Sequence, residues 1–430
     1  MITASKPKIE IDFTDDKLTS TAGLVFVSAL SKRLGLAEGI AKNVRVKKRQ
    51  RGCSDHQMLM SLIYSFCSGN GHLSDIDALS CDTPVCRVVG IDRLPNSRRL
   101  GEYLASFTQM GLLGLLQVSR DVCRQVIPQV IDDHVSRLSY VPVFMDGSAL
   151  EVSGRLFEGA KKGYNGEYQY WLHSVFVGGV WVSGRLNEGG VGVTLGWQEQ
   201  LEKDVAPLLD SDVPVWLAMD NAYYNKEVIH YCLDQGWDYS VSLTDRCKRR
   251  PVLEQVDGLP DQAWQDIGMD ESAIFAYHQP HGWRTRQAYV VIRRLYEGRQ
   301  KRLQPAYTVI LVSTDELPIE ELVKRHRAKQ GQENAFKGPL IELDLHHPPC
   351  RKFIANQAFY LCGQIAQVML KAVQYQCLPI TARKHGIRPI IRYLIRRVAK
   401  LARSGRRWTL RFCKNAFKLD WLIYASYQLE

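Results

Sequence analysis

The sequence lacks several features that would place it in a special class of protein. It has no low-complexity segment, no visible internal repeat and no Gly-rich loop ending in Gly-Lys-Ser or Gly-Lys-Thr that would bind ATP phosphates. The N-terminus has no charged segment followed by an apolar one, so we expect no signal peptide. The longest uncharged run, Phe353–Leu370, contains Asn356, Gln357, Gln364 and Gln367, so we predict a buried helix rather than a membrane span.

The cysteines lack the regular spacing of a disulfide framework. There are eleven, an odd number at irregular intervals, which suits reduced thiols in a cytoplasm. The segment His346–Cys350 has no second Cys or His pair at ligand spacing nearby, so we interpret it as a loop before a helix and not as a zinc site. Hydrophobic residues make up 45% and charged residues 23%, an ordinary globular balance, and 430 residues indicate two to four domains.

Acidic residues are absent from a long C-terminal stretch. Between Leu345 and Leu419 there is no Asp or Glu but there are 16 Lys and Arg, so the rest of the chain sums to 11 − 16 = −5. Such a concentration of charge is typical of a surface that binds a polyanion, with nucleic acid as the leading candidate and a solvated tail as the alternative. Four of these cations recur at four-residue steps, as on one helix face: Arg388, Arg392, Arg396 and Lys400. Residues 42–51 form a second basic segment, predicted to be a loop with room to contact phosphates.

The predicted elements divide the chain into five regions. Residues 1–138 are predicted to be mostly helical. Residues 139–245 read as β-β-β-α-β-α-β, which indicates a mixed sheet flanked by helices; its first strand, Tyr140–Met145, is expected to end at Asp146-Gly147. Residues 246–305 are interpreted as a β-rich insertion, 306–370 as a strand and two helices, and 371–430 as a basic helical tail.

Two aspartates directly follow apolar strands. Asp146 follows VPVFM and Asp220 follows VPVWLAM. A carboxylate at the carboxyl end of a strand lies at the rim of the sheet, where open α/β folds usually place their sites. If the strands are neighbours, the carboxylates repel and a divalent cation relieves the repulsion; oxygen ligands of this kind suit Mg²⁺ or Mn²⁺. Either aspartate alone is more simply a turn residue, but two matching strand endings favour a metal site.

A third acid, Glu333, lies in the predicted helix Leu317–Lys337. One face of that helix carries residues at i, i+3, i+7 and i+11: His326, Lys329, Glu333 and Lys337. This face offers one metal-binding carboxylate flanked by cations, among them Arg327, that could hold phosphates. The alternative is an exposed face of ion pairs.

These residues resemble bacterial insertion-sequence transposases of the DDE type, in particular the cut-and-paste group numbered thirteen-eighty, which is related to the group numbered four. The resemblance covers most of the chain and rests on six segments: Gly71–Leu79, Met145–Gly147, Lys162–Gly166, Met219–Asn221, Glu333-Asn334 and Phe353–Gln357. The family signature around the glutamate is Tyr, two residues, Arg, three residues, Glu, six residues, Lys. This chain keeps Glu333 but has His326, Lys329 and Leu340 at the other positions.

The resemblance implies an α/β fold with a ribonuclease-H-like core, interrupted by a β-rich insertion between the second Asp and the Glu. It implies that Asp146, Asp220 and Glu333 are catalytic and hold two Mg²⁺ ions, with Mn²⁺ as a possible substitute and Asp146 bridging both. The implied reaction is cleavage at transposon ends followed by joining of the 3′-hydroxyls to target DNA. Cations expected to contact DNA are Arg327, Lys329, Lys337, Arg388, Arg392, Arg396 and Lys400.

The expected partners are the terminal inverted repeats and the target DNA, with a homodimer in the DNA complex and no membrane. The expected location is the bacterial cytoplasm, in association with the nucleoid. Two alternatives stay open: a related nuclease that cuts without joining, and a catalytically inactive DNA-binding protein derived from a transposase. An RNA-binding factor is disfavoured because no aromatic stacking motif of an RNA-binding sheet is present.

Overall fold

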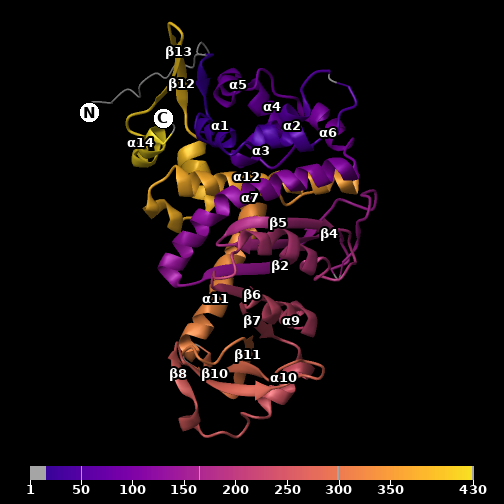
Figure 1. The fold of residues 1–430 in the computed structure, drawn as a ribbon, viewed down its shortest axis with the longest axis vertical. Coiled ribbons are helices and arrows are strands. Elements are labelled where there is room, and N and C mark those ends of the chain that lie inside the picture. Colours follow the sequence, from indigo (N-terminus) through magenta and orange to yellow (C-terminus); the bar gives the residue numbers. More distant parts are fainter. Residues whose placement is uncertain (1–15, 50, 164, 298–299, 429–430) are drawn as a thin grey trace, which may run out of the picture.

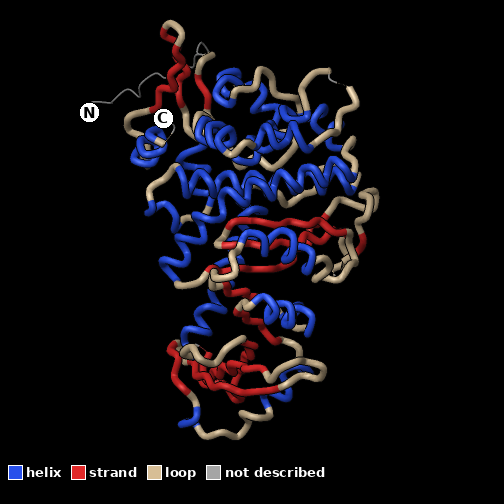
Figure 2. Tube along the Cα trace, in the orientation of Figure 1, coloured by secondary structure: helices blue, strands red, loops and turns tan. Residues whose placement is uncertain are grey.

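The computed structural model describes residues 16–49, 51–163, 165–297 and 300–428, without the side chains of residues 296–303 and 330–338. The molecule is elongated, as Figure 1 shows: a helical block lies at one end, two long helices cross beneath it, and a sheet runs to the other end. Colouring by secondary structure separates the helical upper half from the strands that continue to the bottom (Figure 2). All eleven cysteines lie within the described residues and have free thiols.

The N-terminal region is helical, as predicted. Its helices are α1 (Leu24–Arg33), α2 (Leu36–Asn43), α3 (Asp55–Cys67), α4 (Asp75–Cys81), α5 (Thr83–Val89), α6 (Ser97–Leu104) and α7 (Gln109–Leu138). Helix α3 begins with a capping box between Ser54 and Gln57, which satisfies backbone donors at its first turn. Of the basic segment, residues 42–43 end α2, while residues 44–49 and 51 form a loop, as expected.

The central sheet has the predicted order of elements. The chain runs through β2 (Val141–Glu151), β4 (Tyr168–Val177), β5 (Val180–Asn187), the helical turns α8 (Trp197–Gln200), η1 (Leu201–Val205) and η2 (Ala206–Leu208), then β6 (Val215–Met219), α9 (Lys226–Gln235) and β7 (Asp238–Leu243). In space the strands lie in the order β5-β4-β2-β6-β7, with β5, β2, β6 and β7 running in one direction and β4 in the opposite direction. The short strand β3 (Lys161–Lys162) pairs with β4.

Turn chemistry explains two features of this order. The β4–β5 hairpin turns at Gly178 and Gly179, which both have positive φ, as a two-residue hairpin turn requires. Helix α9 ends at Gly236, also at positive φ. The predicted end of the first strand is wrong: β2 continues through Asp146 to Glu151, because β4 pairs with it over that whole length.

The predicted β-rich insertion extends this sheet and does not form a separate one. After α10 (Arg246–Leu253), which the pattern did not predict, and the turn η4 (Asp261–Ala263), come β8 (Gln265–Gly268), β9 (Glu271–His278), β10 (Gln287–Glu297) and β11 (Gln300–Val312). Strand β11 pairs with β7, and the sheet continues through β10 and β9 to β8. Helix α11 (Ile319–Lys337) then returns along the sheet and ends in the turn η5 (Gly338–Glu342).

Helix α12 (Phe353–Gln376) is the predicted buried helix. Its buried glutamines form hydrogen bonds to the backbone of the neighbouring strand, which explains why polar side chains are tolerated there. Gln364 accepts a hydrogen bond from the Gly184 amide at 3.0 Å and donates to the Val182 carbonyl at 2.6 Å. Gln367 lies between the Trp181 amide and the Gly179 carbonyl in the same way. The side-chain amides of the two glutamines thus pair with backbone N–H and C=O groups at the free edge of β5, which no other strand of the described residues covers.

In the described part of the chain, no helix has both the length and the apolarity needed to cross a membrane.

The C-terminal region corrects a prediction. It contains η6 (Ile380–Lys384), α13 (Ile387–Ile390), η7 (Ile391–Ile395), β12 (Ala399–Ser404), β13 (Arg407–Phe412) and α14 (Leu419–Tyr427). The helical run that starts with α13 ends at Ile395, so the prediction of a single helix carrying cations as far as Lys400 is wrong. Strand β12 forms instead because it pairs with β13 on one side and with β1 (Leu18–Thr19), almost 400 residues earlier, on the other.

Candidate active site

The two aspartates occupy corresponding positions on neighbouring parallel strands. The last pairing between β2 and β6 joins Phe144 to Ala218, and Asp146 and Asp220 each lie two residues further along. Because side chains alternate along a strand, both carboxylates belong to the same face as Phe144 and Ala218. Both residues are half-buried, and Asp220 keeps an extended backbone.

Local backbone contacts fix each aspartate. One oxygen of Asp146 accepts a hydrogen bond from the Gly147 amide at 2.8 Å, and one oxygen of Asp220 caps the following turn by accepting from the Ala222 amide at 2.9 Å. Gly147 itself has no room for a side chain, since a Cβ there would lie 2.3 Å from the indole nitrogen of Trp171. The glycine after Asp146 is therefore required by packing.

Tyr223 lies close to both carboxylates. It belongs to the turn η3 (Asn221–Tyr223) that Asp220 caps, and its side chain is 1% exposed. Burial raises the pKa of Tyr223 well above its usual value, and the negative charges of Asp146 and Asp220 raise it further. The two aspartates therefore share one electrostatic environment, as expected for corresponding positions on neighbouring parallel strands.

A chain of buried hydrogen bonds begins at Tyr223. Its hydroxyl bonds Nε2 of His173, on strand β4, and Nδ1 of His173 bonds the side chain of Gln200. Burial lowers the pKa of His173 to about 4, so its imidazole is neutral at pH 7. Gln200 in turn donates to the Ser183 hydroxyl at 2.9 Å.

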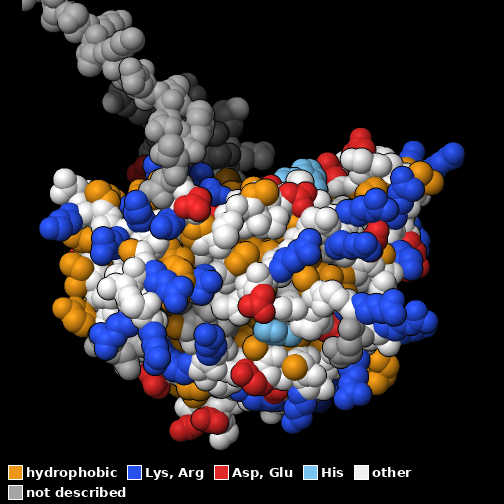
Figure 3. Space-filling model, turned by 90° about the horizontal axis from the view of Figure 1, so that it is seen from above, with side chains coloured by type: hydrophobic (Ala, Val, Ile, Leu, Met, Phe, Trp, Pro, Cys, Tyr) orange, Lys and Arg blue, Asp and Glu red, His pale blue; other side chains and the backbone are white. Residues whose placement is uncertain are grey.

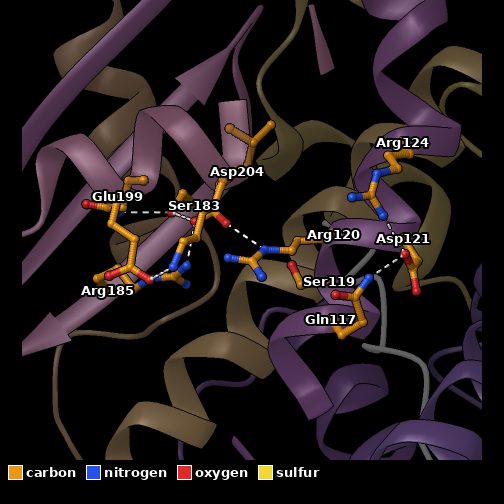
Figure 4. Close-up of polar contacts among 12 residues, drawn as sticks. Gln117, Ser119, Arg120, Asp121, Arg124, Ser183, Arg185, Glu199 and Asp204 are labelled. Atoms are coloured by element: carbon orange, nitrogen blue, oxygen red, sulfur yellow. Dashed lines mark hydrogen bonds and ion pairs between the residues drawn. The ribbon is translucent and has the colours of Figure 1, made fainter. Parts of the chain in front are cut away.

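The chain ends at Asp204, a buried carboxylate held by two arginines. Ser183 donates to it at 2.6 Å, Arg185 of β5 contacts it at 2.6 Å and Arg120 of α7 at 2.8 Å. Figure 4 shows Asp204 with Ser183 and Arg185 on one side and Arg120 on the other. Fixed contacts therefore connect the aspartate site to helix α7 through the interior of the sheet domain.

Helix α11 packs on the sheet face that carries the two aspartates. His326 contacts the hydroxyls of Ser240 and Ser242 on β7 at 2.9 and 2.8 Å, and Ser240 pairs with Ala218. Arg325 stacks over Trp216 at the start of β6, 5.2 Å from the ring centre. Burial lowers the pKa of His326 to about 3, so this helix is anchored through a neutral imidazole.

The other residues predicted on α11 have different surroundings. The side chains of Glu333 and Lys337 lie outside the described residues. Lys329 is buried, while Arg327 forms an ion pair at 2.6 Å with Glu271 of β9 and so fastens the helix to the extended sheet. Among the side chains that the structure describes, no group of three or more His, Cys, Asp or Glu could hold a metal ion.

The four C-terminal cations do not share one helix face. Arg396 is a structural residue: its guanidinium donates to the carbonyls of Ser68 and Gly69 and to Asn70. The other three are exposed at separate positions: Arg388 on α13, Arg392 beside the Tyr393 ring, and Lys400 on β12.

The residues that support the two aspartates give no signal of this role in the sequence. His173 and Gln200 appear as isolated polar residues in apolar patterns, 27 positions apart, and nothing local indicates that they meet Tyr223. Only the pairing of β4 with β2, which sets His173 opposite Gly147, brings them to the site.

The chain matches the family described as "Transposase DDE domain group 1" over residues 2–430. No curated protein matches it. Since the match covers the helical block, the sheet and the C-terminal region alike, it concerns the whole architecture and not one segment.

Proposed function

Because the chain belongs to the family of proteins with a transposase DDE domain, we propose that it cuts DNA at transposon ends and joins the freed 3′-hydroxyls to target DNA, with Asp146, Asp220 and Glu333 as its catalytic carboxylates. The observation that carries this proposal is the placement of Asp146 and Asp220 at corresponding positions of two parallel strands. The proposal extends to terminal inverted repeats as the cleavage sites and to a homodimer in the DNA complex.

The strand order supports a ribonuclease-H-like core. Numbered along the chain, the strands β2, β4, β5, β6 and β7 lie in the spatial order 3-2-1-4-5, with only the second antiparallel to the rest. In this arrangement the first and fourth strands are neighbours, and they carry the two aspartates. In sequence, the strands β8–β11 lie between Asp220 and the helix of Glu333. In space they extend the sheet beyond β7, so they do not lie between β6 and that helix.

The course of α11 supports Glu333 as the third carboxylate. Arg325 stacks at the start of β6, and position 333 lies eight residues further, about 12 Å along a helix. Asp220 lies four residues beyond Trp216, about 13 Å along a strand. A helix that runs from the amino to the carboxyl ends of β6 and β7 would therefore bring position 333 level with Asp220, on the face that both aspartates share.

The donor set fits divalent cations of the Mg²⁺ type. Two carboxylates on adjacent strands present hard oxygen ligands, and the nearby Tyr223 and His173 are neutral. Asp146, Asp220 and Glu333 would hold the ions, with Mn²⁺ as a substitute. Once bound, such ions activate an attacking water or 3′-hydroxyl and stabilise the leaving oxygen of a phosphodiester.

Backbone and side-chain groups of the protein hold these carboxylates in place. The Gly147 and Ala222 amides orient one oxygen of each aspartate, and the Tyr223–His173 bond ties the loop after β6 to strand β4. Preorganised ligands need no rearrangement when charge develops on the phosphate, which favours the transition state.

The proposal is tested with the purified full-length chain and DNA that carries the ends flanking its reading frame. We expect wild type to cleave in Mg²⁺ and Asp146→Asn, Asp220→Asn and Glu333→Gln to lose cleavage while still binding DNA. Asp212→Asn, at an exposed position outside the site, is the matched control and should cleave normally. Strand transfer from a pre-cut end separates a transposase from a nuclease that only cuts. A wild type that binds but never cleaves in Mg²⁺ or Mn²⁺ would establish the inactive alternative.

A further inference from the structure

The C-terminal hairpin of β12 and β13 extends from the helical end of the molecule (Figure 1). Its strands pair from Ala399–Phe412 to Ser404–Arg407, and the turn consists of Gly405, at positive φ, and Arg406. Strand β1 covers the other edge of β12, so β13 is the outer strand among the described residues. The hairpin is thus a two-stranded arm on a short sheet.

Strand alternation sorts its side chains onto two different faces. One face carries the cross-strand pairs Lys400–Arg411, Ala402–Thr409 and Ser404–Arg407, all polar or small. The other carries Ala399–Phe412, Leu401–Leu410 and Arg403–Trp408. Ala399 and Leu401 are buried against the body of the protein, so the cationic face is the one turned outward.

The tip of the arm is held in place by an aromatic contact. The guanidinium of Arg87, from α5, lies 4.1 Å from the Trp408 ring centre, and that of Arg403 lies 5.4 Å from it. The contact with Arg87 fixes the hairpin against the helical block, and that with Arg403 lies within the hairpin. The outward face is therefore presented on a rigid support.

Three arginines of the hairpin have no neutralising partner among the described residues. Within the described part of the chain, Arg406, Arg407 and Arg411 are exposed and form no ion pair or hydrogen bond through their side chains. The acid-free stretch explains this, because no Asp or Glu lies between Leu345 and Leu419.

The rest of this end of the molecule has the same sign of charge. Seen from above, Lys and Arg side chains are spread over the face that carries the hairpin and the helical block, and they visibly outnumber Asp and Glu (Figure 3). The basic loop after α2 contributes to it and lines an open groove of about 1400 Å³ together with Arg93 and Arg99. A polyanion would therefore meet favourable potential on approach.

We propose that the β12–β13 hairpin is a DNA-contacting arm whose Arg406, Arg407 and Arg411 bind backbone phosphates of double-stranded DNA. This proposal rests on the proposed function for its choice of DNA over other polyanions. A two-stranded ribbon is narrow enough to lie along a groove of the duplex. The competing explanation is that cations on an outer strand only prevent edge-to-edge aggregation.

The test compares full-length variants in duplex DNA binding at several salt concentrations. Replacing Arg406, Arg407 and Arg411 together by Gln should flatten the slope of log affinity against log salt by up to about 3 units, since each phosphate contact contributes roughly 0.9. Affinity should fall equally on terminal and unrelated DNA, because phosphate contacts do not read sequence. The triple Lys variant keeps the charges and should keep most of the slope.

A matched control removes three cations that the protein already neutralises. Lys203, Arg284 and Lys324 are exposed and ion-paired to Glu199, Asp234 and Glu321, so their triple Gln variant has the same net charge but should leave the slope unchanged. Circular dichroism verifies the fold of each variant, and if the triple Gln variant is unfolded, the three single variants should each lose about one third of the effect.

Wild-type slope and affinity in a folded hairpin variant would overturn the proposal, and increased aggregation of that variant would then favour the edge-protection explanation. Loss of affinity for single-stranded RNA with unchanged affinity for duplex DNA would overturn it as well. The outcome is independent of catalysis: hairpin-dependent binding by a chain that never cleaves DNA would refute the proposed function but leave the arm established.

Discussion

The Tyr223 hydroxyl and the His173 imidazole form a buried hydrogen bond that joins the loop after β6 to strand β4. Strand β2, which carries Asp146, lies between these two elements in the sheet. The bond therefore spans the strand of one aspartate and anchors the turn of the other, so that the spacing of the two carboxylates depends on a contact between two neutral side chains.

Tyr223→Phe should impair catalysis more than it impairs folding. Loss of the hydroxyl leaves Nε2 of His173 buried without its partner, which costs about 1–3 kcal/mol of unfolding free energy. Because the turn capped by Asp220 is then less firmly held, we expect a higher Mg²⁺ concentration for half-maximal cleavage and weaker Mn²⁺ binding by calorimetry. DNA affinity should stay the same.

The neighbouring residue supplies the control. Tyr224 is also buried, and its hydroxyl bonds that of Tyr289 at 2.8 Å, away from the aspartates. Tyr224→Phe should lose a similar amount of stability and leave the Mg²⁺ dependence as in wild type. If both variants changed the Mg²⁺ dependence equally, the effect would be general loosening, and the specific role of Tyr223 would be refuted.

Asp204→Asn should be strongly destabilising. The Asp204 side chain is 1% exposed and lies between Arg120 and Arg185, so its neutralisation leaves two largely buried guanidinium groups without a counter-charge. Removing one partner of such a buried network typically costs about 3–5 kcal/mol. Urea unfolding at pH 7 measures this loss.

Asp121→Asn is the comparison on the same helix as Arg120. Asp121 pairs with Arg124 at the surface, where both side chains are nearly half exposed, so the loss should be below about 1 kcal/mol. Equal losses for the two variants would show that the Asp204 network carries no special share of the stability.

Stability should fall as the pH drops below neutrality. Burial lowers the pKa of His134 and His173 to about 4 and that of His326 to about 3, from 6.5 in the unfolded chain. Between pH 4 and 6.5 the unfolded state binds more protons than the folded state, so the unfolding free energy rises with pH in this window. Above pH 6.5 both states carry neutral imidazoles, and the stability no longer depends on these histidines' titration.

The slope of this effect can be measured by urea unfolding at pH 5.0, 5.5, 6.0, 7.0 and 8.0. Each neutral histidine contributes at most about 1.4 kcal/mol per pH unit, and contributions should fade above pH 7. His134→Gln should reduce the slope, since its imidazole, bonded to the Gly178 carbonyl at 3.2 Å, would no longer titrate. A stability that stays constant from pH 5 to 8 would contradict buried neutral imidazoles.

The sequence was most informative where structure depends on short-range patterns. Local patterns predicted β4, β5, β6, α9 and β7 in the right order, and two similar apolar runs, each followed by an aspartate, drew attention to Asp146 and Asp220. What failed depends on distant partners. The pairing of β12 with β1 replaced the expected helix, and the pairing of β4 with β2 extended the strand through Asp146.

The support of the site could not be predicted for the same reason. His173, Gln200 and Asp204 meet only because particular strands are neighbours, and a polar residue in an apolar strand gives no indication of its partner. Likewise Arg396 looked like a member of a cationic face, but it binds carbonyls at the end of α3, more than 300 residues away in sequence.

Gln364→Leu tests whether the buried glutamines of α12 hold the edge of the sheet. Gln364 bonds the Gly184 amide, the Val182 carbonyl and the Ser119 hydroxyl, so an apolar side chain of similar size leaves these groups buried without partners. We expect a loss of about 2–5 kcal/mol in unfolding free energy, because each unsatisfied group costs about 1–3 kcal/mol and partial relaxation offsets some of it.

Gln357→Leu on the same helix removes one bond, to the Leu186 carbonyl, at a half-buried position and should lose about 1 kcal/mol or less. Urea unfolding of both variants decides the matter: an unchanged or greater stability of Gln364→Leu would mean that helix burial alone closes this edge, and that the amides contribute nothing to it.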